Sequence, residues 1–313
     1  MTRPPKDIEK QEPAGEPPAE RAPMTIPRVA EMKRNGEPIV MVTAYDFPSA
    51  QVAEESGVDL VLVGDSAAMV VLGHDSTPPV GMDEMVMLTA AVRRGLETPL
   101  LIGDLPFGSY EQSNEQAIQN AQRFVKAAGC DAVKLERGGS SVERARAIVN
   151  AGIPVMGHVG LTPQTATALG GFKAQGRTAE AAAKLAEEAL ALQSVGCFAI
   201  VFEAIPAAVT ETLMERLEVP VIGIGAGPAA DGQVLVFHDL LGIYGGRVPR
   251  FVRRYAEVRE QMVKGVSAYT DDVRHRRFPA EEHTYSIDPE ELEEFKRYLE
   301  DESLVGTDTP WDW

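Results

Sequence analysis

Asp59-Leu-Val-Leu-Val-Gly-Asp65 is a short apolar run that ends at an acidic residue, and the 313-residue chain contains this pattern three more times. The other copies are Leu100-Leu-Ile-Gly-Asp104, Ala132-Val-Lys-Leu-Glu136 and Phe198-Ala-Ile-Val-Phe-Glu203. Such aliphatic runs are typical of buried parallel strands. Acids at the ends of these strands would meet at one rim, where barrel enzymes hold their chemical groups. For any single acid, the alternative is that it caps the following helix.

Strand-like and helix-like segments alternate along most of the chain. The helical pattern is clearest at residues 114–128, 142–151 and 179–195. Eight strands with helical crossovers predict an α/β fold, a (β/α)8 TIM barrel, and a doubly wound open sheet is the alternative. The expected strands are 39–43, 60–64, 100–103, 132–135, 154–157, 199–202, 221–223 and 234–237.

Three parts of the chain differ in composition. Residues 1–23 are rich in Pro, Glu and Ala and are expected to form a disordered tail rather than a secretory signal. Residues 24–286 are expected to form the barrel. Residues 287–313 carry ten acids and two bases, so this predicted acidic extension holds −8 of the net charge of −17. Its short helix is expected to begin at Asp288 and Pro289, and residues 252–269 are expected to form one or two further helices.

Charge and cysteine content exclude some classes of partner. A net charge of −17 with no basic stripe argues against a nucleic-acid partner. No apolar stretch approaches the ~20 residues that cross a bilayer. Cys130 and Cys197 open two similar strand-like segments, so both are predicted to be small buried hydrophobes. Two such thiols indicate a reducing cytoplasm rather than a disulfide framework.

The first carboxylates predict a magnesium site. Asp65 and Asp104 end successive predicted strands, which lie about 4.8 Å apart in a sheet, so their oxygens can share one small cation. Oxygen-only ligands suit Mg²⁺, and Glu136 could complete the sphere directly or through water. Lys134 lies two residues before Glu136 and therefore faces the same side of the strand, into the barrel. The alternative for Lys134 is a salt bridge in the barrel core.

Glu203 ends the sixth predicted strand after a strongly apolar stretch. Desolvation should raise the pKa of this carboxylate, which suits a general base at neutral pH. Capping of the following helix is the alternative. His158 ends the fifth strand and can reach the same rim. A lone His is more often a satisfied hydrogen-bonding residue than a catalyst, so His158 is given a supporting role.

Ordered motifs over residues 24–286 closely resemble those of the ketopantoate hydroxymethyltransferase family. The late segment Phe278-Pro-Ala-Glu-Glu-His-Thr-Tyr285 also resembles that family. The other segments are Thr43-Ala-Tyr-Asp46, Val63-Gly-Asp-Ser66, Gly73-His-Asp-Ser-Thr77, Asp104-Leu-Pro-Phe107, Val133-Lys-Leu-Glu136, Gly157-His-Val-Gly-Leu-Thr-Pro-Gln164, Gly170-Gly-Phe-Lys-Ala-Gln-Gly-Arg177 and Gly223-Ile-Gly-Ala-Gly227.

The resemblance implies a barrel of the phosphoenolpyruvate/pyruvate type that catalyses the first committed step of pantothenate synthesis. The expected substrates are 3-methyl-2-oxobutanoate and 5,10-methylenetetrahydrofolate, and the expected product is 2-dehydropantoate. A ring-like homo-oligomer, a decamer, is implied as well. The implied site residues are Mg²⁺ ligands Asp65, Asp104 and Glu136, substrate contacts Asp65, Ser66, Asp104 and Lys134, and the proton acceptor Glu203.

The chain departs from the family pattern in three places. Arg137 stands where the family usually has Gly, Pro78-Pro79 replaces a Leu-Pro-like pair, and both tails fall outside the resemblance.

Two rival functions remain open. One is an Mg²⁺ barrel that cleaves or rearranges carbon–carbon or carbon–phosphorus bonds, like the isocitrate lyases and phosphoenolpyruvate mutases. Those enzymes place a Cys-bearing lid loop or extra acids near the metal, whereas both Cys residues here open predicted strands. The other is a non-catalytic scaffold, which predicts that some of the five charged residues would be replaced, and all five are present.

Overall fold

A computed structural model of the chain describes residues 21–136, 140–246 and 248–300. Arg137, most of the predicted N-terminal tail and the last residues of the acidic extension lie outside the described residues. The strands close into one barrel in the order β1 to β8, and every neighbouring pair is parallel. The predicted (β/α)8 barrel is therefore confirmed, and the open-sheet alternative is excluded. The strands are β1 Ile39–Thr43, β2 Leu60–Val63, β3 Leu100–Asp104, β4 Ala132–Lys134, β5 Val155–Gly160, β6 Ala199–Glu203, β7 Val221–Ile224 and β8 Gly232–Leu235.

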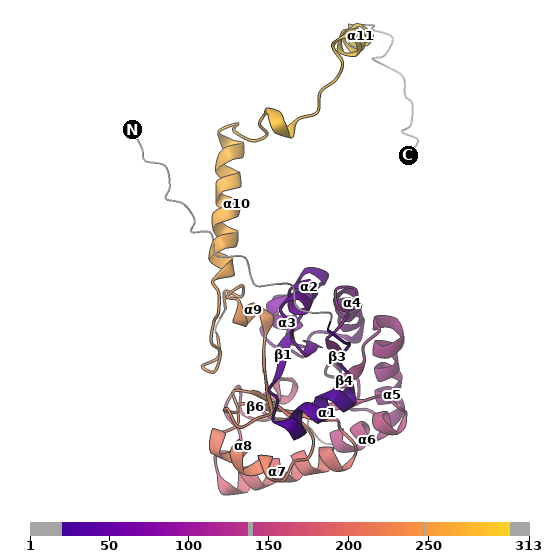
Figure 1. Ribbon diagram of the computed structural model, residues 1–313, viewed down its shortest axis with the longest axis vertical. Helices are drawn as coiled ribbons and strands as arrows, with labels where there is room; N and C mark the ends of the chain where they lie inside the picture. The colour runs from indigo at the N-terminus through magenta and orange to yellow at the C-terminus, as the bar shows by residue number, and fades with distance from the viewer. Residues whose placement is uncertain (1–20, 137–139, 247, 301–313) are drawn as a thin grey trace, which may run out of the picture. The chain divides into compact units, whose positions relative to one another are not determined.

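Helices surround the strands of the barrel, as Figure 1 shows for α2 and for α4 to α8. The helical elements up to Leu240 are α1 Ile26–Asn35, α2 Phe47–Glu55, α3 Ala67–Val70, α4 Met82–Arg93, α5 Asn114–Arg123, the π-turn Phe124–Ala128, α6 Ser141–Asn150, the 3-10 turn Pro163–Thr165, α7 Ala179–Ser194, α8 Ala207–Met214 and α9 Phe237–Leu240. Several start where a side chain caps the first turn. Thr178 Oγ1, for example, accepts from the backbone N–H of Ala181 at the start of α7.

Most predicted strand ends agree with the structure to within one residue, but the fifth and eighth strands were placed wrongly by two residues or more. The fifth strand continues to Gly160 because it keeps pairing with β6, Gly160 lying opposite Glu203. The last strand begins at Gly232, opposite Ile39 of β1, and ends before Val236, which caps α9. Hydrogen-bonded pairing with another strand, far away in the sequence, sets the ends of both strands. The local pattern of apolar residues contains no information about this pairing.

The barrel interior and the helix–sheet layer are two separate cores. Inward-facing residues of all eight strands pack with Val29 and Met32 of α1, which are 0% and 5% exposed. The inner row of β3 runs Leu100, Ile102 and then Asp104, because side chains alternate between the faces of a strand. In β6, Ala199 and Val201 face the barrel interior, and the same alternation turns Glu203 to that side. Apolar residues therefore fill the barrel up to its carboxyl end, where charged residues take over.

The chain divides into two compact units, one ending at Glu257 and the other beginning at Val258. The second unit contains α10 Val258–Arg274, the 3-10 turn Glu281–His283 and α11 Pro289–Glu300. Asp288 Oδ1 accepts from the N–H of Glu290, so the predicted start of the last helix is confirmed. The helix expected from residue 252 starts later, because residues before it run beside α9, where the N–H of Tyr255 donates to Leu240 O at 2.9 Å.

Two further expectations can be compared with the structure. Both cysteines are buried, Cys130 at 4% and Cys197 at 1% exposure, as predicted. Across the part of the chain that the structure describes, no helix has the length and apolar character that crossing a membrane requires.

Candidate active site

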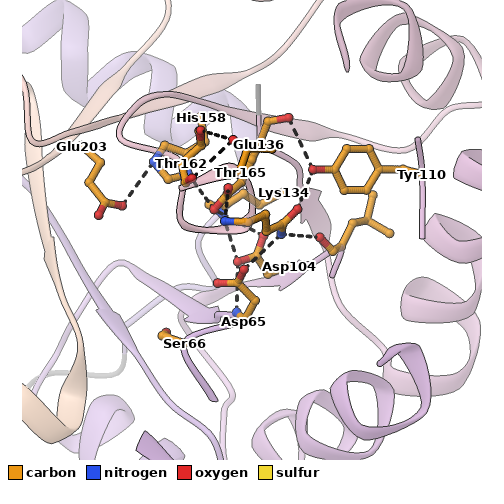
Figure 2. A network of polar contacts seen from close by, with 12 residues as sticks. Asp65, Ser66, Asp104, Tyr110, Lys134, Glu136, His158, Thr162, Thr165 and Glu203 are labelled. Atoms are coloured by element: carbon orange, nitrogen blue, oxygen red, sulfur yellow. Dashed lines mark hydrogen bonds and ion pairs between the residues drawn. The ribbon is translucent and has the colours of Figure 1, made fainter. Parts of the chain in front are cut away.

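The carboxyl ends of β2 to β6 bring the predicted charged residues into one polar network (Figure 2). Five of the residues are almost fully buried, at 1–5% exposure, namely Asp65, Asp104, Lys134, Glu136 and His158. Glu203 borders the network, and its side chain is 15% exposed. Ser66 lies beside Asp65 at the start of α3. The convergence expected from the sequence is therefore present.

Lys134 and Asp104 form the central ion pair. Lys134 Nζ lies 2.8 and 2.9 Å from the two carboxylate oxygens of Asp104. The side chain of Lys134 is 4% exposed and that of Asp104 is 1% exposed. Glu136 Oε1 lies 3.8 Å from the same ammonium. Burial opposes the charge of Lys134, but the carboxylates of Asp104, Glu136 and Asp65 outweigh it and raise the pKa of Lys134. The lysine is therefore a permanent cation at neutral pH.

Asp65 adds a second acid beside Asp104. The N–H of Asp65 donates to Asp104 Oδ2 at 3.1 Å. Burial, and then the charges of Asp104 and Glu136, raise the pKa of Asp65 well above its usual range. Burial likewise raises the pKa of Glu136 to about 8. Three buried carboxyl groups thus share one lysine, and their ionised forms together would carry more negative charge than this lysine can balance, so a bound cation would favour ionisation.

This donor set fits a hard divalent cation. Glu136 Oε1 is buried and makes no hydrogen bond within the described ranges, so it is available to a ligand or a bound water. Among the same residues, no three His, Cys, Asp or Glu side chains are arranged to ligate one ion together. An ion here would therefore take few protein oxygens and keep several waters, as Mg²⁺ does. It would share Asp104 with Lys134.

His158 lies between two carboxylates. Its Nε2 is 3.3 Å from Glu203 Oε2, and its Nδ1 is 3.4 Å from Glu136 Oε1. Neither ring nitrogen makes a well-formed hydrogen bond to a described residue, so the general expectation of a satisfied histidine does not hold. Burial, and then the charge of Lys134, lower the pKa of His158. The imidazole is thus neutral, and it links Glu203 to the other carboxylates.

Glu203 has the environment expected of a base. Burial raises its pKa, and the contact with His158 only partly offsets this effect. The end of β6 positions the side chain, because the backbone of Glu203 pairs with Ile224 on one side and Gly160 on the other. In Figure 2 its carboxylate points toward His158, apart from the cluster around Asp104.

Three polar residues of the network had no role in the sequence-based prediction. The side-chain amide of Gln164 donates to Asp65 Oδ2 at 3.1 Å, and the hydroxyl of Tyr110 donates to Gln164 Oε1 at 2.7 Å. The hydroxyls of Tyr45 and Ser66 are 2.8 Å apart. Tyr45 and Gln164 lie inside segments that carry the family resemblance, which was the only signal available for them.

The closed barrel with charged groups at its carboxyl end places the chain in the class of (β/α)8 barrel enzymes. The chain has the fold of phosphonopyruvate hydrolase, with a TM-score of 0.56 at 12% identity over 90% of this chain and 98% of that one. It also matches 2,3-dimethylmalate lyase, a PEP mutase/isocitrate lyase superfamily member, with a TM-score of 0.54 at 16% identity over 91% and 100% of the two chains. At these identities the likeness concerns the fold.

Sequence comparison narrows this class to one family. Residues 23–281 match the ketopantoate hydroxymethyltransferase family, and the chain belongs to it. The chain is 52% identical to 3-methyl-2-oxobutanoate hydroxymethyltransferase of Moorella thermoacetica, over 85% of this chain and 99% of that protein. The enzyme of the same name from Geobacillus kaustophilus is 50% identical over 83% and 93% of the two chains. The protein is therefore a transferase, and the predicted family is confirmed.

Proposed function

We propose that this enzyme transfers the one-carbon unit of 5,10-methylenetetrahydrofolate to 3-methyl-2-oxobutanoate and forms 2-dehydropantoate, the first step of pantothenate biosynthesis. The observation that carries the proposal is the arrangement of Glu203 opposite a buried lysine–carboxylate cluster, in a chain that belongs to this family. The cluster can hold an anionic 2-oxo acid, and Glu203 can remove a proton from it.

Glu203 acts first, as the general base. The C3–H bond of the 2-oxo acid breaks, the proton goes to the Glu203 carboxylate, and the electron pair moves into an enolate. A desolvated carboxylate with a raised pKa is a stronger base than an exposed one, and such proton transfer contributes about 10²–10⁴-fold to a rate. His158 Nε2 lies 3.3 Å from this carboxylate, close enough to donate to it after a small adjustment of the ring.

Lys134 and the acids at the barrel mouth bind the substrate. The ammonium of Lys134 stays charged beside Asp104, so it can attract the carboxylate of the 2-oxo acid. Asp65 and Asp104 would hold Mg²⁺, with Glu136 acting through water, because no three acids among the described residues are arranged to ligate one ion directly. When bound, Mg²⁺ supplies positive charge beside the oxygen on which negative charge develops. Ser66, adjacent to Asp65, is the remaining substrate contact.

Formation of the carbon–carbon bond completes the reaction. Water opens the methylene bridge of the folate: both bonds from the methylene carbon to nitrogen break, the two water hydrogens go to the two nitrogens, and the water oxygen becomes the carbonyl oxygen of the released one-carbon unit. The enolate carbon then attacks that carbonyl carbon, a C–C bond forms, and the new alkoxide takes back the proton held by Glu203, so that tetrahydrofolate and 2-dehydropantoate leave. Burial of the charged groups strengthens their effect on the developing charge, because few waters compete with them.

An activity assay tests the whole proposal. The purified protein is incubated with 3-methyl-2-oxobutanoate and Mg²⁺, with and without methylenetetrahydrofolate, and 2-dehydropantoate is quantified. Product should form only with the folate. Folate-independent breakdown of 2-oxo or phosphonate acids would instead support the bond-cleaving rival.

A substitution separates the base from the binding groups. Glu203→Gln should abolish exchange of the C3 hydrogen of 3-methyl-2-oxobutanoate with deuterium oxide, because an amide cannot accept the proton. Affinity for Mg²⁺ should hardly change. Wild-type exchange rates in this variant would remove Glu203 from the role of base.

The remaining expectations belong to the same proposal. The partners are a small 2-oxo acid and a folate, with neither nucleic acid nor membrane, and the place of action is the cytoplasm. The assembly is a homo-oligomer, a decamer by analogy with the family. Light scattering tests the last point, since a decamer has ten times the 33.8 kDa mass of one chain.

A further inference from the structure

Gln164 contacts two of the three carboxylates in the cluster. Its side-chain amide nitrogen donates to Asp65 Oδ2 at 3.1 Å, and its backbone N–H donates to Glu136 Oε2 at 3.0 Å. The residue is 6% exposed and lies in the 3-10 turn Pro163–Thr165 that follows β5. One residue on the loop after the fifth strand therefore connects acids that come from the second and fourth strands.

The partners of the Gln164 amide permit one orientation only. Its nitrogen donates at 3.0 Å to the carbonyl oxygen of Leu105, which can only accept, and at 3.1 Å to Asp65 Oδ2. A flipped amide would turn its own oxygen toward both acceptors and lose both hydrogen bonds. The amide can donate two hydrogens, and both are used here.

Tyr110 holds the other side of the amide. Its hydroxyl donates to Gln164 Oε1 at 2.7 Å, and the tyrosine is 3% exposed. The backbone oxygen of Tyr110 accepts from Arg144 Nε at 3.1 Å, which ties the tyrosine to α6. Tyr110 and Asp65 are both visible in the network of Figure 2. The side-chain amide of Gln164 thus uses both of its donor hydrogens and one acceptor position on its oxygen. The backbone N–H of Gln164 is also bonded, to Glu136.

We propose that Gln164 is a positioning residue that fixes Asp65 and Glu136 relative to each other, and that Tyr110 locks the Gln164 amide in the orientation this requires. The role rests on the proposed function, because those two acids are proposed to hold the cation there, Asp65 directly and Glu136 through water. Each acid gives one oxygen to Gln164, which leaves its second oxygen free to turn toward an ion or a water. Mutation of residues that orient metal-binding groups in this way typically lowers metal affinity by about 10–100-fold.

The test measures cation binding without either substrate. Mn²⁺ is the probe, because it takes the same hard oxygen ligands as Mg²⁺ and its free form is counted by electron paramagnetic resonance. Gln164→Met keeps the length of the side chain but cannot hold Asp65, and we expect its Mn²⁺ affinity to fall about 10–100-fold. Tyr110→Phe removes only the locking hydroxyl and should lower the affinity in the same direction by less.

A matched control comes from a second bridging glutamine. Gln193 Oε1 accepts from the N–H groups of Glu218 and Val219, at 2.7 and 3.2 Å, ahead of β7 at the opposite end of the barrel. Gln193→Met should lower the thermal midpoint by a similar amount and leave the Mn²⁺ affinity unchanged. A purely structural role of Gln164 predicts equal Mn²⁺ affinities in the two variants, and that result would overturn the proposal.

Activity provides a second readout. In Gln164→Met the Mg²⁺ concentration needed for half-maximal rate should rise, and saturating Mg²⁺ should restore much of kcat, which a folding defect would not allow. The binding experiment is independent of turnover. Wild-type protein that binds Mn²⁺ but makes no 2-dehydropantoate would refute the proposed function and leave the role of Gln164 intact. Wild-type protein that binds no Mn²⁺ would refute the role of Gln164.

Discussion

At the scale of single residues, Lys134 is a buried charge whose removal should destabilise the fold. Its ammonium is buried against Asp104, and removing one partner of a buried ion pair costs about 3–5 kcal/mol, because the other charge stays uncompensated. Lys134→Met should therefore lower the urea midpoint and abolish formation of 2-dehydropantoate.

Lys33→Met is the matched control for this prediction. Lys33 pairs with Asp231 at 2.8 Å, between α1 and the residue before β8, and both side chains are about 15% exposed. Its removal should lower the urea midpoint less and leave the activity near the wild-type level. Equal losses of activity in the two variants would contradict the binding role of Lys134.

The two cysteines provide a prediction that depends on pH. Burial raises the pKa of Cys130 and of Cys197 to about 12, so at pH 8 the reactive thiolate should be roughly 10³-fold scarcer than in an unfolded chain. Native protein should react with a thiol reagent far more slowly than protein in urea. Because the folded pKa is raised, the resulting stability is present below pH ~9 and is lost as the pH rises toward 12. Rapid labelling of native protein at pH 8 would contradict the burial.

At the scale of elements, Gly160 is where backbone geometry affects the site. It ends β5 with a φ of +98°, and a Cβ there would lie 2.2 Å from the carbonyl oxygen of Glu203. Gly160→Ala should push the end of β6 away and displace Glu203. We expect loss of activity together with a markedly lower thermal midpoint or yield of folded protein.

Gly152→Ala separates this contact from simple backbone strain. Gly152 has a φ of +86°, but nothing lies within 4 Å of the position of its Cβ. This variant should show only the strain of a left-handed residue, about 1–2 kcal/mol, and keep its activity. If the two variants lose equal stability and both stay active, the contact of Gly160 with Glu203 has no functional importance.

The elements also show what a local pattern can and cannot predict. An aliphatic run followed by an acid was enough to predict that Asp65, Asp104 and Glu203 stand at the carboxyl ends of strands, because burial and side-chain alternation are local properties. The hydrogen bond between Gln164 and Asp65 joins residues 99 positions apart, and no local pattern records such a pairing. The end of β5 was misplaced for the same reason, since its last residue is set by Glu203 of the next strand.

At the scale of the whole molecule, the negative charge is concentrated in the C-terminal extension. Residues 287–313 hold −8 of the net −17, so a chain ending at Ser286 would carry −9. No residue of α11, which spans Pro289–Glu300, is buried. Its removal therefore exposes no apolar core.

We accordingly expect deletion of residues 287–313 to leave the thermal midpoint and the formation of 2-dehydropantoate nearly unchanged, while elution from an anion exchanger shifts to lower salt. A full-length variant with Glu290, Glu291, Glu293 and Glu294 changed to Gln keeps the length and removes four charges, so it separates the effect of charge from that of contact. A deletion that lowers the midpoint by several degrees, when the Gln variant does not, would mean that the extension packs against another part of the protein or against a second copy. Calorimetry of the three proteins at one ionic strength makes the comparison, because salt screens charges over about 8–10 Å.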